Sequence, residues 1–203
     1  MKIRDDNYKK RAFKFFLTMV LLFLISLTLS AVFSPPKESI ESIIKGLPKN
    51  LSEMKGIDLV WDYIVQNGLK MPLQMFILAL IPIPFLYSVT LIISSVLFGM
   101  VFGLLLHWNF KQGMVKMLAA SPHLFIEMLA ISFIASGFYM LNQSIIRKVT
   151  NKFKQDKKYN ISFKSTFLNL LKIYILRALP LFILAAFVEA YVPQLLINLL
   201  HEL

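Results

Sequence analysis

The chain has 203 residues, 57% of them apolar, and a mean hydropathy of +0.67. This apolar content exceeds the roughly 45–50% of a soluble domain and predicts an integral membrane protein, while the absence of cysteine excludes disulfides, thiolate metal sites and a cysteine nucleophile. The net charge is +11, and the basic residues that produce it cluster between the apolar runs. They form no nucleic-acid-binding motif, so we expect basic loops beside a membrane and no nucleic acid as a partner.

The first predicted membrane-spanning helix covers residues 13–33 and follows a basic N-terminal stretch. Phe15 to Phe33 form a run of 19 residues without a formal charge. A basic start before an apolar run is also typical of a signal peptide. This run is longer than a usual signal core and further apolar segments follow it, so we interpret it as a retained span.

Residues 34–65 form a polar segment in which acidic and basic residues are nearly balanced. Apolar residues recur at helical spacing within 37–47 and 56–65, which predicts short helices lying at the membrane interface. Trp61 and Tyr63 fit the aromatic anchors that membrane proteins place at that level.

The next apolar run, 71–106, contains 36 residues without a formal charge. One helix of this length would extend about 54 Å, against roughly 30 Å of hydrocarbon, so the chain must turn back. Pro82 and Pro84 supply the break, because proline removes a helical donor and clashes with the preceding turn. The prediction is two spans, 64–82 and 86–106.

Small residues mark one face of the second of these two spans. Ser95, Gly99 and Gly103 recur at every fourth position. Such spacing lets another membrane helix approach closely, so we predict helix packing on this face.

A fourth span is predicted over 122–142, after a short amphipathic connection over 107–119. Pro122 suits its first turn, where the missing N–H would be unsatisfied in any case. Residues 143–172 then carry eight Lys or Arg and one Asp, the strongest charge asymmetry in the chain. The last span is predicted over 173–192, followed by an apolar tail lying along the interface.

The charge pattern orients these five spans as one all-α, polytopic membrane domain covering 1–203, with the N-terminus inside and the C-terminus outside. The basic N-terminus and the basic 143–172 segment then both face the cytoplasm, as the positive-inside rule requires. Four or six spans would place one strongly basic segment on the opposite face.

Ionisable residues occur in two of the predicted spans. His123 and Glu127 lie near the outer end of the fourth, and Glu189 lies near the outer end of the last. A charge inside the bilayer is costly and usually faces protein or water. Three interpretations follow: headgroup-level residues at helix ends, a polar site that fixes helix packing or engages a partner, and a metal or hydrolytic site. A histidine with two carboxylates can bind zinc, but no HExxH motif accompanies this set, so we expect no metal.

Three segments resemble the stage II sporulation protein M family. Residues 121–137 (SPHLFIEMLAISFIASG) resemble its Pro-His-Gly-x-x-Glu segment, although Leu124 stands where the family has glycine. Residues 178–194 (ALPLFILAAFVEAYVPQ) resemble its closing Pro-Leu…Ala-Ala-x-x-Glu-Ala segment. Residues 63–70 (YIVQNGLK) are similar to the start of its second span, with Asn67 at the matching position. The order and spacing of the segments also match.

The resemblance implies a polytopic bacterial membrane protein, and it suggests that Asn67, Pro122, His123, Glu127 and Glu189 are functional residues. We expect no cofactor. The family's namesake scaffolds a septal peptidoglycan-degrading machine during sporulation, and related members accompany circular bacteriocin genes, often beside an ABC-type ATPase. We therefore expect a scaffold or transport-associated component that binds a membrane, envelope or peptide partner, rather than an enzyme. The alternatives are an intramembrane enzyme that processes a peptide through His123, Glu127 and Glu189, and an ion- or proton-coupled transporter.

Overall fold

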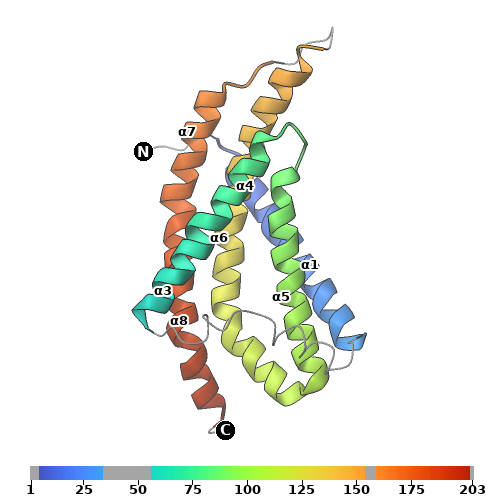
Figure 1. Ribbon diagram of the computed structural model, residues 1–203, viewed down its shortest axis with the longest axis vertical. Coiled ribbons are helices and arrows are strands. Elements are labelled where there is room, and N and C mark those ends of the chain that lie inside the picture. Colours follow the sequence, from blue (N-terminus) through green and yellow to red (C-terminus); the bar gives the residue numbers. More distant parts are fainter. Residues whose placement is uncertain (1–4, 34–55, 154–158, 202–203) are drawn as a thin grey trace.

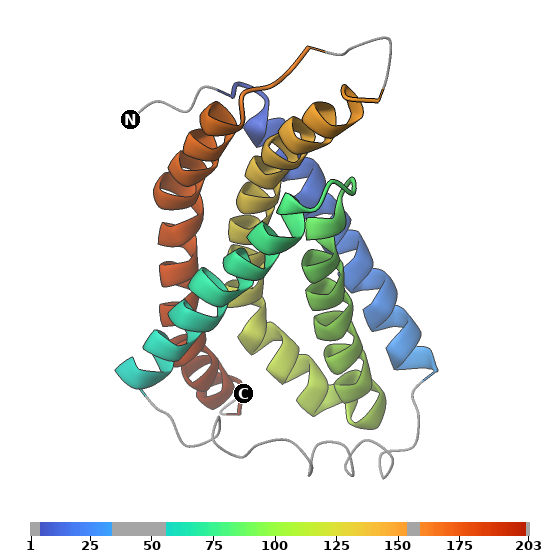
Figure 2. The ribbon, with the colours of Figure 1, turned by 45° about the horizontal axis from the view of Figure 1, so that its top comes forward.

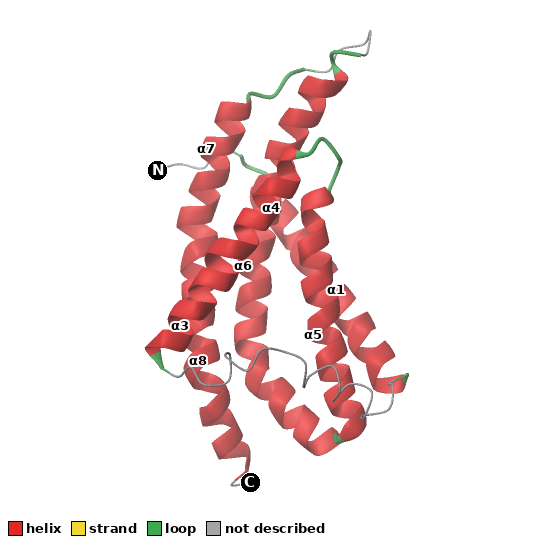
Figure 3. Ribbon diagram, viewed as in Figure 1, coloured by secondary structure: helices red, strands yellow, loops and turns green. Residues whose placement is uncertain are grey.

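The computed structural model describes residues 5–33, 56–153 and 159–201, and within these ranges the backbone forms helices joined by short loops, without strands (Figure 3). The predicted helix over 37–47 lies outside the described residues. Four helices are long and apolar enough to cross a membrane: Tyr8–Val32, Leu86–Trp108, Phe110–Thr150 and Phe163–Leu196. The prediction of an all-α, polytopic membrane bundle is therefore confirmed.

The helices cross the bundle in alternating directions (Figures 1 and 2). In chain order the described elements are α1 (Tyr8–Val32), α3 (Ile57–Tyr63), η2 (Ile64–Lys70), α4 (Met71–Leu80), η3 (Leu86–Ser88), α5 (Val89–Trp108), α6 (Phe110–Thr150), α7 (Phe163–Ile173), η4 (Tyr174–Ala178) and α8 (Leu179–His201). The α3–η2–α4 run is continuous but more polar, and it is not among the four long apolar helices.

The helix α6 differs most from its prediction. It begins at Phe110 rather than at Pro122, so the expected connection over 107–119 is helical and the proline lies inside the helix. The Asn109 side chain caps the new start by accepting from the Gln112 N–H at 3.1 Å. Gly113 permits the tight reversal from α5, because a Cβ there would lie 2.6 Å from the Leu105 carbonyl oxygen.

The basic segment 143–172 is also mostly helical, which corrects its interpretation as a loop. The helix α6 continues to Thr150 and α7 begins at Phe163, where the Ser162 side chain caps the first turn. Charged residues mark where a helix leaves the apolar layer, but they do not end it, because lysine and arginine are good helix formers.

The chain turns between α4 and α5 at residues 81–85, as its two prolines predict. Asn142 of α6 holds this turn: its Nδ2 donates to the carbonyls of Ala79 at 3.0 Å and of Ile81 at 2.9 Å. Asn142 is buried. These bonds matter because the last carbonyls of α4 have no partner within their own helix.

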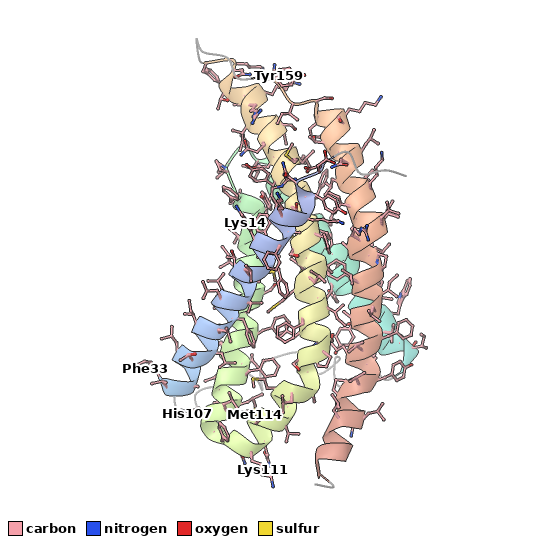
Figure 4. The ribbon with its side chains drawn as sticks, turned by 180° about the vertical axis from the view of Figure 1, so that it is seen from behind. Lys14, Phe33, His107, Lys111, Met114 and Tyr159 are labelled. Atoms are coloured by element: carbon pink, nitrogen blue, oxygen red, sulfur yellow. The ribbon has the colours of Figure 1, made fainter. Side chains whose placement is uncertain are left out.

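The closest helix pair is α1 with α5, which lie side by side in Figures 1 and 2. Gly99 abuts the backbone of α1 at Phe23, and a Cβ at Gly103 would lie 2.7 Å from the Ser30 Cβ. At the far end of the pair, the His107 Nδ1 lies 2.7 Å from the Ala31 carbonyl oxygen (Figure 4 labels His107). The small residues on this face of α5 therefore let the backbones of α1 and α5 pack in direct contact.

Two helical runs widen locally into π-helix, and in both cases a proline follows directly. Pro72 is the second residue after η2, and Pro180 is the second residue after η4. A proline in a helix lacks an N–H and clashes with the carbonyl four residues earlier. A wider turn relieves that clash, so the prolines explain why the helix widens at η2 and at η4.

Two carbonyls that stand four residues before a helical proline accept hydrogen bonds from side chains. Gly68 stands four residues before Pro72, and its carbonyl accepts from the Tyr174 hydroxyl at 2.7 Å. Leu118 stands four residues before Pro122, and its carbonyl accepts from the Ser121 hydroxyl at 2.9 Å. The helix α6 bends in its N-terminal third (Figure 2), as a helix with an internal proline does.

Replacing Tyr174 with phenylalanine is expected to lower the free energy of unfolding by about 1–2 kcal/mol, because the Gly68 carbonyl then loses its donor. The measurement is unfolding of the purified protein in detergent. Pro72→Ala supplies the matched background, since alanine restores an N–H for that carbonyl. The cost of Tyr174→Phe should shrink there, and an equal cost in both backgrounds would place the role of the hydroxyl elsewhere.

Candidate functional site

Three helices bring ionisable side chains together at one end of the bundle. The helix α8 packs against both α3 and α6. It thereby carries Glu189 between Tyr63, the last residue of α3, and His123 and Glu127 of α6. His123 and Glu127 are four residues apart in a helix and so lie on one face of α6.

Glu189 is the bridging member of this group. Its Oε1 lies 3.6 Å from the His123 Nε2, and its carboxylate is hydrogen-bonded by the Tyr63 side chain. Of the two ring nitrogens, Nε2 faces the carboxylate, so a proton held on Nε2 would point toward Glu189. One carboxylate on α8 is thus tied to an imidazole on α6 and to a phenol on α3.

Glu127 lies deeper than Glu189. The residue is only 3% exposed, and its carboxylate interacts electrostatically with that of Glu189 and with the Tyr63 hydroxyl. Two carboxylates in a buried site cannot both remain charged without a proton, a cation or another positive group between them. The group is therefore arranged to hold a shared proton or to receive a cationic group.

His123 has unused hydrogen-bonding capacity. Its side chain is 8% exposed, and its Nδ1 is buried without a hydrogen-bonding partner among the described residues. With the proton on Nε2, Nδ1 of the neutral ring is an acceptor. A buried polar atom without a partner is uncommon and calls for an explanation, such as a binding or catalytic role.

The structure brings together three of the five residues that the resemblance singled out. His123, Glu127 and Glu189 meet, whereas Pro122 precedes them in the bend of α6. Asn67 lies half-buried in η2, one helical turn beyond Tyr63.

Tyr63 is the member that sequence reasoning missed as part of the site, because an aromatic residue near a span is typical of an interfacial anchor. The available signal was its position four residues before Asn67, on the same helical face.

The metal interpretation gains no support. Within the described ranges, no group of three His, Asp or Glu side chains is placed to hold a metal ion.

The fold and this site define a class: an all-α membrane protein that gathers a buried histidine, a buried carboxylate and a half-buried carboxylate where three of its helices meet. No curated protein and no solved structure matches the chain. The family model described as stage II sporulation protein M matches residues 12–194. The chain therefore belongs to the stage II sporulation protein M family and is a membrane protein of that family.

Proposed function

We propose that the protein is a five-span scaffold or transport-associated component of the bacterial cytoplasmic membrane, and that a peptide or protein partner engages it at Tyr63, His123, Glu127 and Glu189. One observation carries this proposal: Glu189 links side chains of three separate helices inside a bundle where a buried charge is costly. Helix packing alone needs no such group, since small residues already serve that purpose between α1 and α5.

The charge at the opposite end supports a cytoplasmic face there. The end that carries the α6–α7 connection lies away from the C-terminus (Figures 1 and 2) and includes Arg147, Lys148, Lys152 and Lys164. The positive-inside rule then directs the Glu189 site to the outer half of the membrane. A partner such as a secreted peptide or an envelope protein fits that location, and a cytoplasmic ATPase would fit the basic end.

Photo-crosslinking in cells that express the neighbouring genes tests the proposal. A photoreactive residue at Trp61, which is 65% exposed and two residues from Tyr63, should yield one recurrent adduct identified by mass spectrometry. The matched control is Phe13, which is 59% exposed on α1. No adduct at Trp61, or the same adducts at both positions, would contradict the proposal.

The intramembrane enzyme is the second candidate, because an imidazole beside a carboxylate is the arrangement of a general base. Under this hypothesis His123 Nδ1 would take a proton from a substrate or from water, while Glu189 orients the ring. Peptide maturation by Glu127→Gln and by His123→Gln variants separates the two candidates. If the protein is a scaffold, cells with either variant should yield a peptide of the same covalent structure as cells with the unmodified protein. If it is an enzyme, the variants should leave the precursor uncleaved or without its ring closed.

A further inference from the structure

A second group of polar side chains surrounds a cavity between α1, α6 and the α4–α5 turn. The cavity has a volume of about 310 Å³. Its lining residues are Arg11, Lys14, Phe15, Thr18, Phe85 and Tyr139. The Arg11 guanidinium lies 5.2 Å from the centre of the Tyr139 ring, and it also pairs with Asp5. Since Asp5 offsets Arg11, Lys14 leaves the group with a net positive charge.

Two buried hydrogen-bond donors, one on the cavity wall and one packed directly behind it, have no partner among the described residues. One is the Arg11 Nε, and the other is the hydroxyl of Tyr87, whose side chain is fully buried. Tyr87 interacts electrostatically with Arg11, and its ring lies 6.4 Å from Phe15 and 6.4 Å from Phe85, which both line the cavity. Unsatisfied buried donors are rare, and two of them close to one cavity favour a ligand that supplies an acceptor.

The backbone at the cavity wall is strained. Phe85 has a φ of 62°, the only positive φ of a non-glycine residue in the described ranges. Its ring packs 5.9 Å from that of Tyr139, which holds the aromatic wall in place. Such a conformation persists only where its surroundings fix it, and it is concentrated at ligand-binding sites.

The cavity lies at the charged end of α1, which is the level where lipid headgroups are expected to meet a membrane-spanning bundle. Lys14 is the last charged residue before the uncharged run of α1, and Figure 4 shows it near the end of α1 opposite Phe33. Phe13 and Leu17 are 59% and 50% exposed, so the outer face of α1 next to Lys14 is apolar. A ligand with an anionic head and apolar chains matches both surfaces.

We propose that this cavity binds the phosphate group of an anionic phospholipid. The Arg11 Nε–H and the Tyr87 O–H donate to phosphate oxygens, Lys14 contributes charge, and the acyl chains follow the exposed face of α1. Charge-assisted hydrogen bonds to a phosphate give the strength, and the aromatic wall excludes water from them. An anionic lipid is preferred over a zwitterionic one, because no carboxylate lines the cavity to pair with an ammonium group.

Lipid titration of the delipidated full-length protein tests the proposal. Phosphatidylglycerol should raise the thermal unfolding midpoint, with little effect of phosphatidylcholine or of inorganic phosphate. Tyr87→Phe keeps the ring and removes one orphan donor, so it should weaken the apparent affinity for phosphatidylglycerol about threefold to tenfold. Arg11→Gln should weaken it about tenfold or more.

Lys164→Gln is the matched control, because it removes one positive charge from α7, outside the cavity, and should leave the affinity unchanged. Equal responses to phosphatidylglycerol and phosphatidylcholine would overturn the proposal, as would an undiminished affinity in Tyr87→Phe. A response to inorganic phosphate alone would overturn the lipid as the source of the anion. Each of these outcomes leaves the proposal for the Glu189 site unaffected.

Discussion

Replacing Gly99 with leucine is expected to separate α1 from α5 and to lower the free energy of unfolding by at least about 3 kcal/mol. Overpacking usually costs about 1–3 kcal/mol, and the upper end or more applies where the obstacle is backbone. A Cβ at Gly99 would overlap the Phe23 carbonyl and the Ser26 side chain, and α1 can avoid it only by moving away. Detergent-solubilised protein should show the loss as a lower unfolding midpoint.

Gly68→Ala is the matched control, because the nearest atom to its added Cβ would be the Phe182 Cβ at 3.6 Å, an ordinary contact. That variant should unfold close to the midpoint of the unmodified protein. Gly99→Ala should fall between the two, since it adds only the overlapping Cβ. A leucine variant as stable as the alanine control at Gly68 would mean that α1 and α5 do not pack this closely.

Apolar runs and charge predicted the arrangement of the helices better than their ends. The uncharged run in α1 and the proline turn at 81–85 lie where the sequence indicated. The predicted start of α6 was wrong because Pro122 was interpreted as part of the first turn of the span. The helix begins at the Asn109 cap, and the proline lies inside it.

Local pattern alone could not predict the shape of the helical runs around the prolines. Pro72 and Pro180 are visible in the sequence, but the π-helical widening before each depends on a neighbour that accommodates it. Tyr174 lies 106 positions from Gly68 in the chain, and only the packed bundle brings its hydroxyl to that carbonyl.

The candidate site shows the same division between what topology predicts and what packing adds. Alternating spans suggested that His123, Glu127 and Glu189 share one end of the bundle, because helix direction fixes depth. Tyr63 joins them only because α8 packs between α3 and α6. The depth of these side chains in the membrane could be inferred from the charge pattern. The helices that pack against α8 could not be inferred from it.

Replacing Glu189 with glutamine is expected to reduce partner crosslinking at Trp61 by at least about tenfold, while the bundle stays folded. The amide has the same shape and can still accept from Tyr63, but it carries no charge for His123 or for a cationic group of the partner. Hydrogen bonds to charged groups contribute about 1.5–3 kcal/mol, which corresponds to about tenfold or more in an equilibrium. The unfolding midpoint should change little, because neutralising Glu189 also removes its repulsion of the neighbouring Glu127 carboxylate.

Double variants separate a binding role from a structural one. Glu189 contacts both flanking groups, so His123→Gln and Tyr63→Phe should each weaken crosslinking in the unmodified protein and add little in the Glu189→Gln background. Three independent structural residues would instead show additive losses of stability with unchanged crosslinking per folded molecule. The same adduct yield in Glu189→Gln as in the unmodified protein would falsify the partner site, since Glu189 lies between Tyr63 of α3 and His123 of α6.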